Sequence, residues 1–190
     1  MKLLFLLIIL LLKVSTTYSQ TDQKNLYKTS KGTVSLTSDA PLELISAKSN
    51  ELRGIIDLET YTFAFQVDIQ TLKGFNSSLQ QEHFYENYME TDKYSNASFS
   101  GKIIEKIDFN TNGDYKIRAK GILDIHGVKQ ERIIKCEIIV EDNIIKANST
   151  FEVTLVDHNI SIPKLVYQKI AEVILVELST ELIIMDEKLK

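Results

Sequence analysis

The sequence predicts an all-β protein, an antiparallel barrel of about eight strands with one or two short helices. Apolar and polar residues alternate with a period of two through much of the chain, which is typical of strands that have one packed face and one wet face. Turn-forming residues divide these runs at intervals that fit a barrel or a sandwich. Closure into a barrel is favoured because it removes exposed sheet edges.

The N-terminus has the pattern of a secretory signal peptide over residues 1–19. Lys2 supplies the positive charge, Leu3–Leu12 is the apolar run, and Thr17 and Ser19 are small residues at the positions that a signal peptidase reads. The apolar run has about half of the ~20 residues that a bilayer span needs. We therefore expect cleavage after Ser19 and no membrane span in the mature chain.

The mature chain is expected to be one acidic domain. Removal of 19 of the 190 residues leaves 171, a length typical of a single domain. Lys2 and Lys13 leave with the signal, so Lys and Arg fall from 22 to 20 against 26 Asp and Glu, a net charge near −6. This charge argues against nucleic acid or an anionic membrane surface as a partner. Residues 20–31 are polar and predict a flexible tail, and residues 32–190 the barrel domain.

The strands follow from the alternation and from the turn residues between the runs. In the run 61–69, Phe63, Phe65, Val67 and Ile69 share one face. Asn112-Gly113 is a strong hairpin signal, and His126-Gly127 marks a further turn. The expected strands are Thr33–Thr37, Leu44–Lys48, Leu52–Leu58, Tyr61–Ile69, Ile103–Phe109, Tyr115–Ile125, Val128–Val140, Ile144–Leu155 and Val173–Ile184.

Two segments break this period and predict short helices. In Ser77–Glu90, apolar and polar residues recur at helical spacing, so a helix is expected to cap one mouth of the barrel. Pro163–Ala171 is the second candidate, because proline suits a first helical turn.

Cys136 is the only cysteine, so no intrachain disulfide is possible. Its alternation with Ile134 and Ile138 predicts a small buried side chain rather than a catalytic thiol.

Aromatic and sulfur-containing residues gather near the predicted cap. As a group they suit the rim of an apolar pocket, although an eight-stranded barrel can hold either packed side chains or one small ligand. The pattern alone leaves a filled core and a ligand cavity open. The group is Phe75, Phe84, Tyr88, Met89, Tyr94 and Phe99.

Glu82 and His83 are the main polar candidates in the insert, with Asn87 one helical turn away. They could contact a ligand head group at the cavity mouth. The alternative is a structural polar network that holds the helix on the barrel. His126 is expected to serve in a turn that Gly127 completes.

An enzyme is the competing class of function. His83, His126 and His158 are the only histidines, and their spacing matches no short metal-binding motif. The chain contains no P-loop, dinucleotide-binding or Gly-x-Ser-x-Gly pattern. We therefore expect no catalytic residues, no cofactor and no metal, with a His-dependent metalloenzyme as the less favoured alternative.

Two segments resemble the YceI-like family. The first is LQQEHFYENYME (Leu79–Glu90), followed by Lys93-Tyr94 and Ala97-Ser98-Phe99; the second is GILDIHGV (Gly121–Val128). Ser95 stands where the family typically has a proline. The resemblance extends more loosely from about Gly32 to the C-terminus.

The resemblance implies a lipocalin-like barrel with a long internal tunnel for a polyisoprenoid or related amphiphilic lipid. It implies a periplasmic carrier without turnover, whose partner is an isoprenoid or acyl lipid, acting as a monomer or homodimer. On this interpretation Phe63, Phe65, Val67 and Ile69 line the tunnel wall and Phe75, Phe84, Tyr88, Met89 and Phe99 its mouth. Glu82, His83 and Asn87 would hold the head group.

Overall fold

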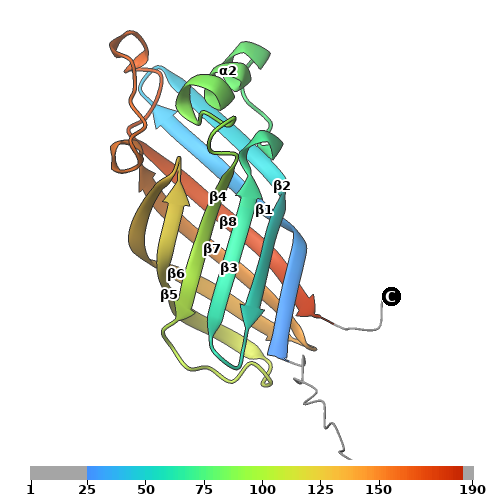
Figure 1. Cartoon of the computed structure of the whole chain (residues 1–190). Coiled ribbons are helices and arrows are strands. Elements are labelled where there is room, and N and C mark those ends of the chain that lie inside the picture. Colours follow the sequence, from blue (N-terminus) through green and yellow to red (C-terminus); the bar gives the residue numbers. More distant parts are fainter. Residues whose placement is uncertain (1–24, 186–190) are drawn as a thin grey trace, which may run out of the picture.

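Eight antiparallel strands close into a barrel in the computed structural model, which describes residues 25–185 (Figure 1). Each strand pairs with its neighbours in sequence, and the last strand pairs with the first. The predicted fold class is therefore confirmed. The predicted signal peptide and residues 20–24 of the predicted tail lie outside the described residues. The strands are β1 (Leu26–Ala40), β2 (Glu43–Asp57), β3 (Thr62–Asp68), β4 (Asn96–Ile103), β5 (Gly113–Ile125), β6 (Val128–Glu141), β7 (Ile144–Thr154) and β8 (Val173–Ile184).

The barrel begins earlier than the sequence predicts. β1 starts at Leu26, so residues 26–31 of the predicted tail belong to a strand. Tyr27 is buried there and pairs with Ile56 on one side and Ile184 on the other. The polar residues around Tyr27 suggested a tail, but this one aromatic side chain fixes the segment in the core.

β2 is one strand where two were predicted. The polar residues between Lys48 and Leu52 suggested a turn, yet the strand continues through them and pairs with β1. Ser49 is almost fully buried, and its hydroxyl is 2.6 Å from that of Thr71. This hydrogen bond satisfies a polar side chain that would otherwise interrupt the strand.

Two of the hairpin turns have positive φ at both central residues. His126 and Gly127 have φ of 54° and 71°, and Asp142 and Asn143 have φ of 49° and 65°, as a tight two-residue hairpin requires. The turn predicted at His126-Gly127 is thus present. Asn112-Gly113 forms no such turn.

The predicted strand Ile103–Phe109 is wrong beyond its first residue. β4 ends at Ile103, and residues 104–112 form a loop over the lower end of the barrel in Figure 1. Phe109 is buried beside Tyr61, with ring centroids 6.0 Å apart. The apolar residues of this segment therefore close an end of the barrel rather than form a wall.

The helical segments are short and lie mostly at the other end. α2 (Ser78–His83) continues into the π-helical turn η3 (Phe84–Tyr88), and together they confirm the predicted cap. The Ser77 side chain accepts a hydrogen bond from the Gln80 backbone N–H and begins the helix. The predicted helix Pro163–Ala171 is only a single 3₁₀ turn, η5 (Lys164–Val166). Two more 3₁₀ turns are η2 (Ile69–Thr71) and η4 (Leu155–His158).

The barrel interior has two apolar clusters, one at each end. The lower cluster contains Ile145 and Leu182, neither of which is exposed at all. The upper cluster surrounds Val67, Leu72 and other residues beneath the cap. Phe65 and Phe99 pack against both clusters and pair directly across β3 and β4. These two rings mark the boundary between the two halves of the interior.

Phe65 depends on the absence of a side chain at Gly54, its direct partner on β2. A Cβ at Gly54 would lie 2.1 Å from Phe65 Cδ1. We expect Gly54→Ala to lower the free energy of unfolding by about 1–3 kcal/mol, because the Phe65 ring must leave its place against the two apolar clusters. Urea denaturation measures this loss.

Gly113→Ala is the matched control, since the nearest atom to its Cβ would be the Tyr115 hydroxyl oxygen at 3.3 Å. Its effect should stay within about 0.5 kcal/mol. The double variant Gly54→Ala/Phe65→Leu should recover part of the loss. Equal effects of the two alanine substitutions would contradict this account.

Candidate functional site

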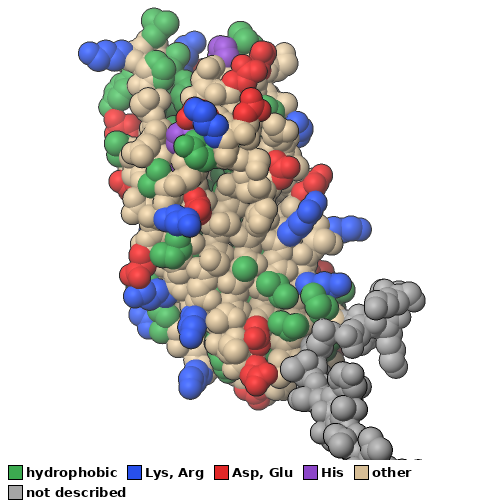
Figure 2. All heavy atoms as spheres, viewed as in Figure 1, with side chains coloured by type: hydrophobic (Ala, Val, Ile, Leu, Met, Phe, Trp, Pro, Cys, Tyr) green, Lys and Arg blue, Asp and Glu red, His purple; other side chains and the backbone are tan. Residues whose placement is uncertain are grey.

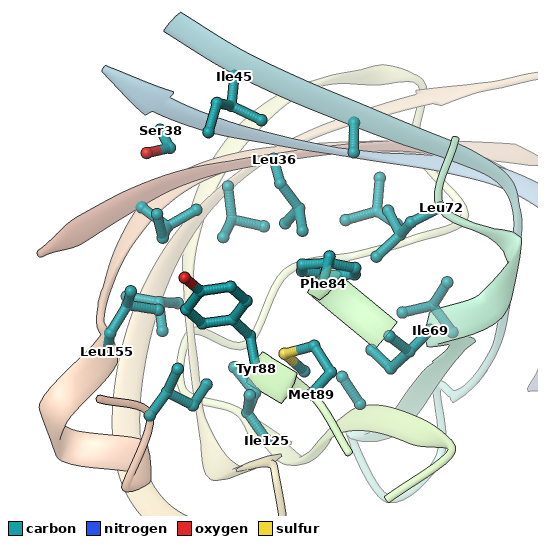
Figure 3. A pocket seen from close by; sticks show the side chains of 18 of the residues that line it. Leu36, Ser38, Ile45, Ile69, Leu72, Phe84, Tyr88, Met89, Ile125 and Leu155 are labelled. Carbon is teal, nitrogen blue, oxygen red and sulfur yellow. The ribbon is translucent and has the colours of Figure 1, made fainter. Parts of the chain in front are cut away.

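A cavity of about 380 Å³ occupies the upper half of the barrel, beneath α2 and η3. Its volume falls within the range of about 300–1,000 Å³ that is usual for small-molecule sites. Figure 3 shows that the labelled lining is almost entirely aliphatic, aromatic or thioether in character. The cavity can therefore exclude water from an apolar ligand but offers few hydrogen bonds.

The barrel wall of the cavity comes from alternate residues on the strands. On β1 the inward residues are Val34, Leu36 and Ser38, and on β8 they are Ile174, Val176 and Leu178. The residues between them point outward because successive side chains of a strand face opposite sides. The same period of two that predicts the fold thus produces the apolar wall.

The cap places aromatic side chains over the cavity. Phe84 packs on Phe75 with ring centroids 4.8 Å apart. At η3 the backbone bond runs from the Met89 N–H to the Phe84 carbonyl oxygen, 2.9 Å, which adds one residue to the turn. As a result Tyr88 and Met89 face the cavity, and Asn87 faces away from it.

Polar contacts fix the beginning of the cap to β2. The Glu43 carboxylate accepts hydrogen bonds from the side-chain amides of Gln80, at 3.0 Å, and Asn76, at 3.1 Å. The Asn76 backbone N–H donates to Gln80 Oε1, also at 3.0 Å. The Tyr85 hydroxyl, further along, donates to the Leu72 carbonyl oxygen. These bonds hold the helix across the mouth.

The end of the cap is fixed to the β5–β6 turn. Glu90 Oε2 lies 3.0 Å from Nε2 of His126, whose Nδ1 lies 3.1 Å from the His158 carbonyl oxygen. Tyr94 stacks edge-on against His126, with ring centroids 4.6 Å apart. Hydrogen bonds from Lys93 and then His126 hold the pKa of Glu90 below its usual value. His126 therefore does more than form a turn, because it joins the cap to the barrel.

The opposite side of the mouth is formed by the segment between β7 and β8. The Ser38 hydroxyl oxygen accepts from the Ala171 backbone N–H at 2.9 Å, and the Leu42 N–H donates to the Gln168 carbonyl oxygen at 2.9 Å. Apolar side chains of this segment are strongly exposed, with Leu165 at 95% and Val156 at 73%. Figure 2 shows hydrophobic side chains gathered at this end of the molecule.

Tyr88 supplies the most distinctive polar atom in the cavity. Figure 3 shows its ring extending among apolar side chains. Within residues 25–185 its hydroxyl makes no hydrogen bond to another residue, and burial raises its pKa above the usual value for tyrosine. A hydroxyl that borders the cavity without a protein partner is available to a ligand that carries an oxygen.

Most of the predicted site residues border this cavity. The nine that do are Phe65, Val67, Ile69, Phe75, His83, Phe84, Tyr88, Met89 and Phe99. His83 lies at the exposed rim.

Three predicted site residues lie elsewhere. Phe63 is buried in the lower cluster and packs on Phe99, with ring centroids 4.9 Å apart. Glu82 and Asn87 are exposed on the outside of the cap. The assumption of a regular α-helix is the reason for the error at Asn87, because η3 shifts the helical face by one residue.

Sequence reasoning also missed residues that line the cavity. They come from β1, β2, β5 and the segments around β7 and β8, and include Leu36, Ser38, Ile45, Ile125, Leu155, Ile160 and Ile174. The alternation identifies the inward residues of each strand, but it does not show which of them border the cavity and which belong to the packed cluster. Ser38 could be recognised only through its contact with Ala171, which is 133 residues away.

The three histidines have different surroundings. In the part of the chain that the structure describes, no group of three or more His, Cys, Asp or Glu residues is placed to hold a metal ion. His158 is fully buried and its Nδ1 lies 3.2 Å from the Val128 carbonyl oxygen, while His83 is exposed on the cap. Burial raises the pKa of the Cys136 thiol, which is the opposite of nucleophile activation.

None of the helices among residues 25–185 has the length and apolar character that crossing a membrane requires.

The contact between Glu90 and His126 predicts a pH-dependent attachment of the cap. The pKa of Glu90 is lower in the folded protein than its ordinary value near 4.5. Its stabilising contribution is therefore present above that value and is lost as the pH falls through the folded value. We expect the stability difference between the unaltered protein and Glu90→Gln to shrink on acidification, as measured by urea denaturation at a series of pH values.

Glu86→Gln is the control, because Glu86 is exposed on the same segment. Its difference from the unaltered protein should be small at every pH. A Glu90→Gln difference that does not change across the acid range would contradict the proposed attachment.

The comparisons with known proteins agree with this architecture. A polyisoprenoid binding domain from Saccharophagus degradans, implicated in plant cell wall breakdown, has 13% sequence identity and a TM-score of 0.72, over 85% of this chain and 99% of that one. BcnA of Burkholderia cenocepacia has 11% identity and a TM-score of 0.65, over 80% and 96%. The YCEI protein of Campylobacter jejuni has 17% identity and a TM-score of 0.51, over 66% and 75%. At these identities the likeness shows a shared fold.

No curated protein sequence matches the chain. The YceI-like domain matches it over residues 14–182, a span that includes all the residues that border the cavity. This match covers most of the chain, and the protein therefore belongs to the YceI-like family.

Proposed function

We propose that this protein is a periplasmic, non-catalytic carrier that holds an isoprenoid or a similar amphiphilic lipid in the cavity of its barrel. The observation that carries the proposal is the cavity itself, whose wall is predominantly apolar and whose mouth is covered by an aromatic cap. A tail gains roughly 0.8 kcal/mol for each CH₂ group that it removes from water. Such a site binds through tail burial and needs few polar contacts.

The head group would lie near the mouth. The Tyr88 hydroxyl is the best placed donor, because it faces the cavity and has no partner in residues 25–185. His83 and Lys169 border the cavity at its exposed rim. This arrangement suits a small oxygen-bearing head group that Tyr88 contacts inside and that the rim side chains can approach from outside. Glu82 and Asn87 have no part in it.

The comparison with the Saccharophagus degradans domain supports the class of ligand. That domain is described as polyisoprenoid-binding, and it shares the fold of this chain with 13% identity. Membership of the YceI-like family supports the same class. The apolar wall provides a physical reason, independent of both, for an apolar ligand.

The N-terminal sequence supports the location. Residues 1–19 have the charge, apolar run and small residues of a secretory signal. An acidic mature chain without a basic cluster fits a secreted monomer or homodimer that does not bind nucleic acid. These features support a carrier that acts in the periplasm, between donor and acceptor membranes.

A barrel filled throughout is the main alternative, and the lower half of this barrel is indeed filled. The open upper half favours a carrier.

Native mass spectrometry of the protein purified from its own periplasm tests the proposal. We expect a stoichiometric adduct that organic extraction releases and identifies as an apolar or amphiphilic lipid. A protein that carries no adduct, and that remains without one after incubation with isoprenoids and fatty acids, would refute the carrier function.

Two neighbouring residues of β8 provide a matched test of the wall. Ile174 lines the cavity, whereas Val173 points outward and is 41% exposed. Ile174→Asp places a carboxylate against the tail and should reduce lipid binding at least tenfold, because burying an unpaired charge is costly. Val173→Asp should leave binding unchanged. Displacement of a fluorescent fatty acid measures both, after denaturation curves show that the variants are folded; equal losses would remove Ile174 from the site.

A further inference from the structure

We propose that the outer edge of the cavity mouth docks on the surface of a phospholipid bilayer, with its exposed apolar side chains inserted among the lipid headgroups. This docking rim consists of Leu42 in the β1–β2 turn, Leu79 on α2, Val156 on η4, and Leu165 and Tyr167 at η5. The inference rests on the proposed function, because a carrier has to reach its lipid in a membrane. The docking rim lies on the outside of the molecule and is distinct from the wall of the cavity.

The side chains of the docking rim are apolar without serving the packing of the fold. More than half of each one is exposed: Leu165 95%, Val156 73%, Leu42 65%, Leu79 57% and Tyr167 55%. Exposed apolar residues that lie singly on a protein surface are common and need no explanation. Apolar residues that gather at one place, with polar residues around them, mark an interaction site instead.

The elements that carry the docking rim meet at one end of the barrel. The Leu42 N–H donates to the Gln168 carbonyl oxygen at 2.9 Å, which joins the β1–β2 turn to the segment after η5. The Leu155 N–H donates to the Glu172 carbonyl oxygen at 2.9 Å and joins η4 to the end of that segment. α2 is held against the start of β2 by Glu43. Figure 1 shows α2 and the segment between β7 and β8 at the same end of the barrel.

The apolar surface continues from the docking rim into the cavity. Leu79 is exposed and also borders the cavity. Val166 and Ile170 are half-buried and border the cavity from the segment that presents Leu165 and Tyr167 to the outside. A lipid tail that leaves a bilayer at this face would therefore stay in contact with apolar side chains until it reaches the cavity. This continuity favours a bilayer as the occupant, because a second protein seated here would block the mouth.

The charges beside the docking rim complement lipid phosphates. Lys164 and Lys169 are exposed and flank Leu165 and Tyr167 in the sequence. Within residues 25–185 neither lysine forms an ion pair with a carboxylate. A lysine can hold its ammonium group at the level of the phosphates while a neighbouring leucine inserts more deeply. Zwitterionic lipids also carry phosphate, and the acidic charge of the mature chain favours them over anionic lipids.

Two pairs of substitutions test the docking rim. Val156→Gln/Leu165→Gln removes its two most exposed apolar side chains, which the fold does not need for packing. Ile133→Gln/Ile183→Gln is the matched control, because these side chains are 55% and 54% exposed elsewhere on β6 and β8. Sedimentation of the protein with phosphatidylcholine vesicles measures docking. We expect the first pair to weaken vesicle binding at least about tenfold and the control pair to leave it unchanged.

A second measurement separates docking from lipid binding. Displacement of a fluorescent fatty acid in solution should be the same for Val156→Gln/Leu165→Gln and the unaltered protein, because neither residue lines the cavity. Equal vesicle binding by these two proteins would overturn the docking rim and leave the carrier function intact. So would a dimer, seen by analytical ultracentrifugation, that the rim substitutions alone dissociate, since the rim would then contact a second copy of the chain. An unaltered protein that binds vesicles but no lipid in solution would instead refute the carrier function.

Discussion

The pairing of the first strand with the last is the constraint on which the rest of the structure depends. Residues Thr33–Thr37 of β1 pair in antiparallel order with residues 175–179 of β8. This seam carries two inward pairs of the cavity wall, Val34 with Leu178 and Leu36 with Val176. With a single cysteine in the chain, no disulfide can replace these hydrogen bonds. Closure therefore removes two sheet edges and completes the wall of the site at once.

The two halves of the interior have opposite roles. Side chains that line a cavity make fewer dispersion contacts with one another than those of a filled core, so the upper half contributes less packing between protein residues. The lower half is filled by residues such as Ile145 and Leu182, and it supplies the packing that the upper half lacks. The cap follows the same division. It is tied down by polar contacts at its two ends, through Glu43 and through Glu90, and presents its apolar side to the cavity.

The sequence predicted most of the fold because its dominant signal is local. The strand Val173–Ile184 was predicted with the bounds that the structure has, since its alternation is regular and uninterrupted. Reasoning from local sequence failed where contacts between residues far apart in the sequence determine the structure of a segment. Tyr27 holds a polar segment in the barrel by pairing with Ile56 and Ile184. Phe109 turns an alternating segment into a closing loop.

The site was predictable in its chemistry more than in its geometry. Aromatic residues near the cap indicated an apolar pocket, and nine of the twelve proposed residues border it. The π-helical turn at Phe84–Tyr88 moved Asn87 outward, and nothing in its sequence distinguishes it from an ordinary helical turn. The contact of Phe65 with Gly54 was equally hidden, because it depends on the register that places these two residues opposite each other. Register across strands is a property of the folded sheet, and a single strand does not encode it.

The seam between β1 and β8 also has a kinetic consequence. Thr33 and Ser179 are in contact across 146 residues of sequence. Contacts of such long range form late, because the entropy of closing the loop is lost before any pairing repays it. The wall on β8 cannot exist until nearly the entire chain has been synthesised. An incomplete chain therefore has no closed barrel, and the cavity can form only after the last strand has been made.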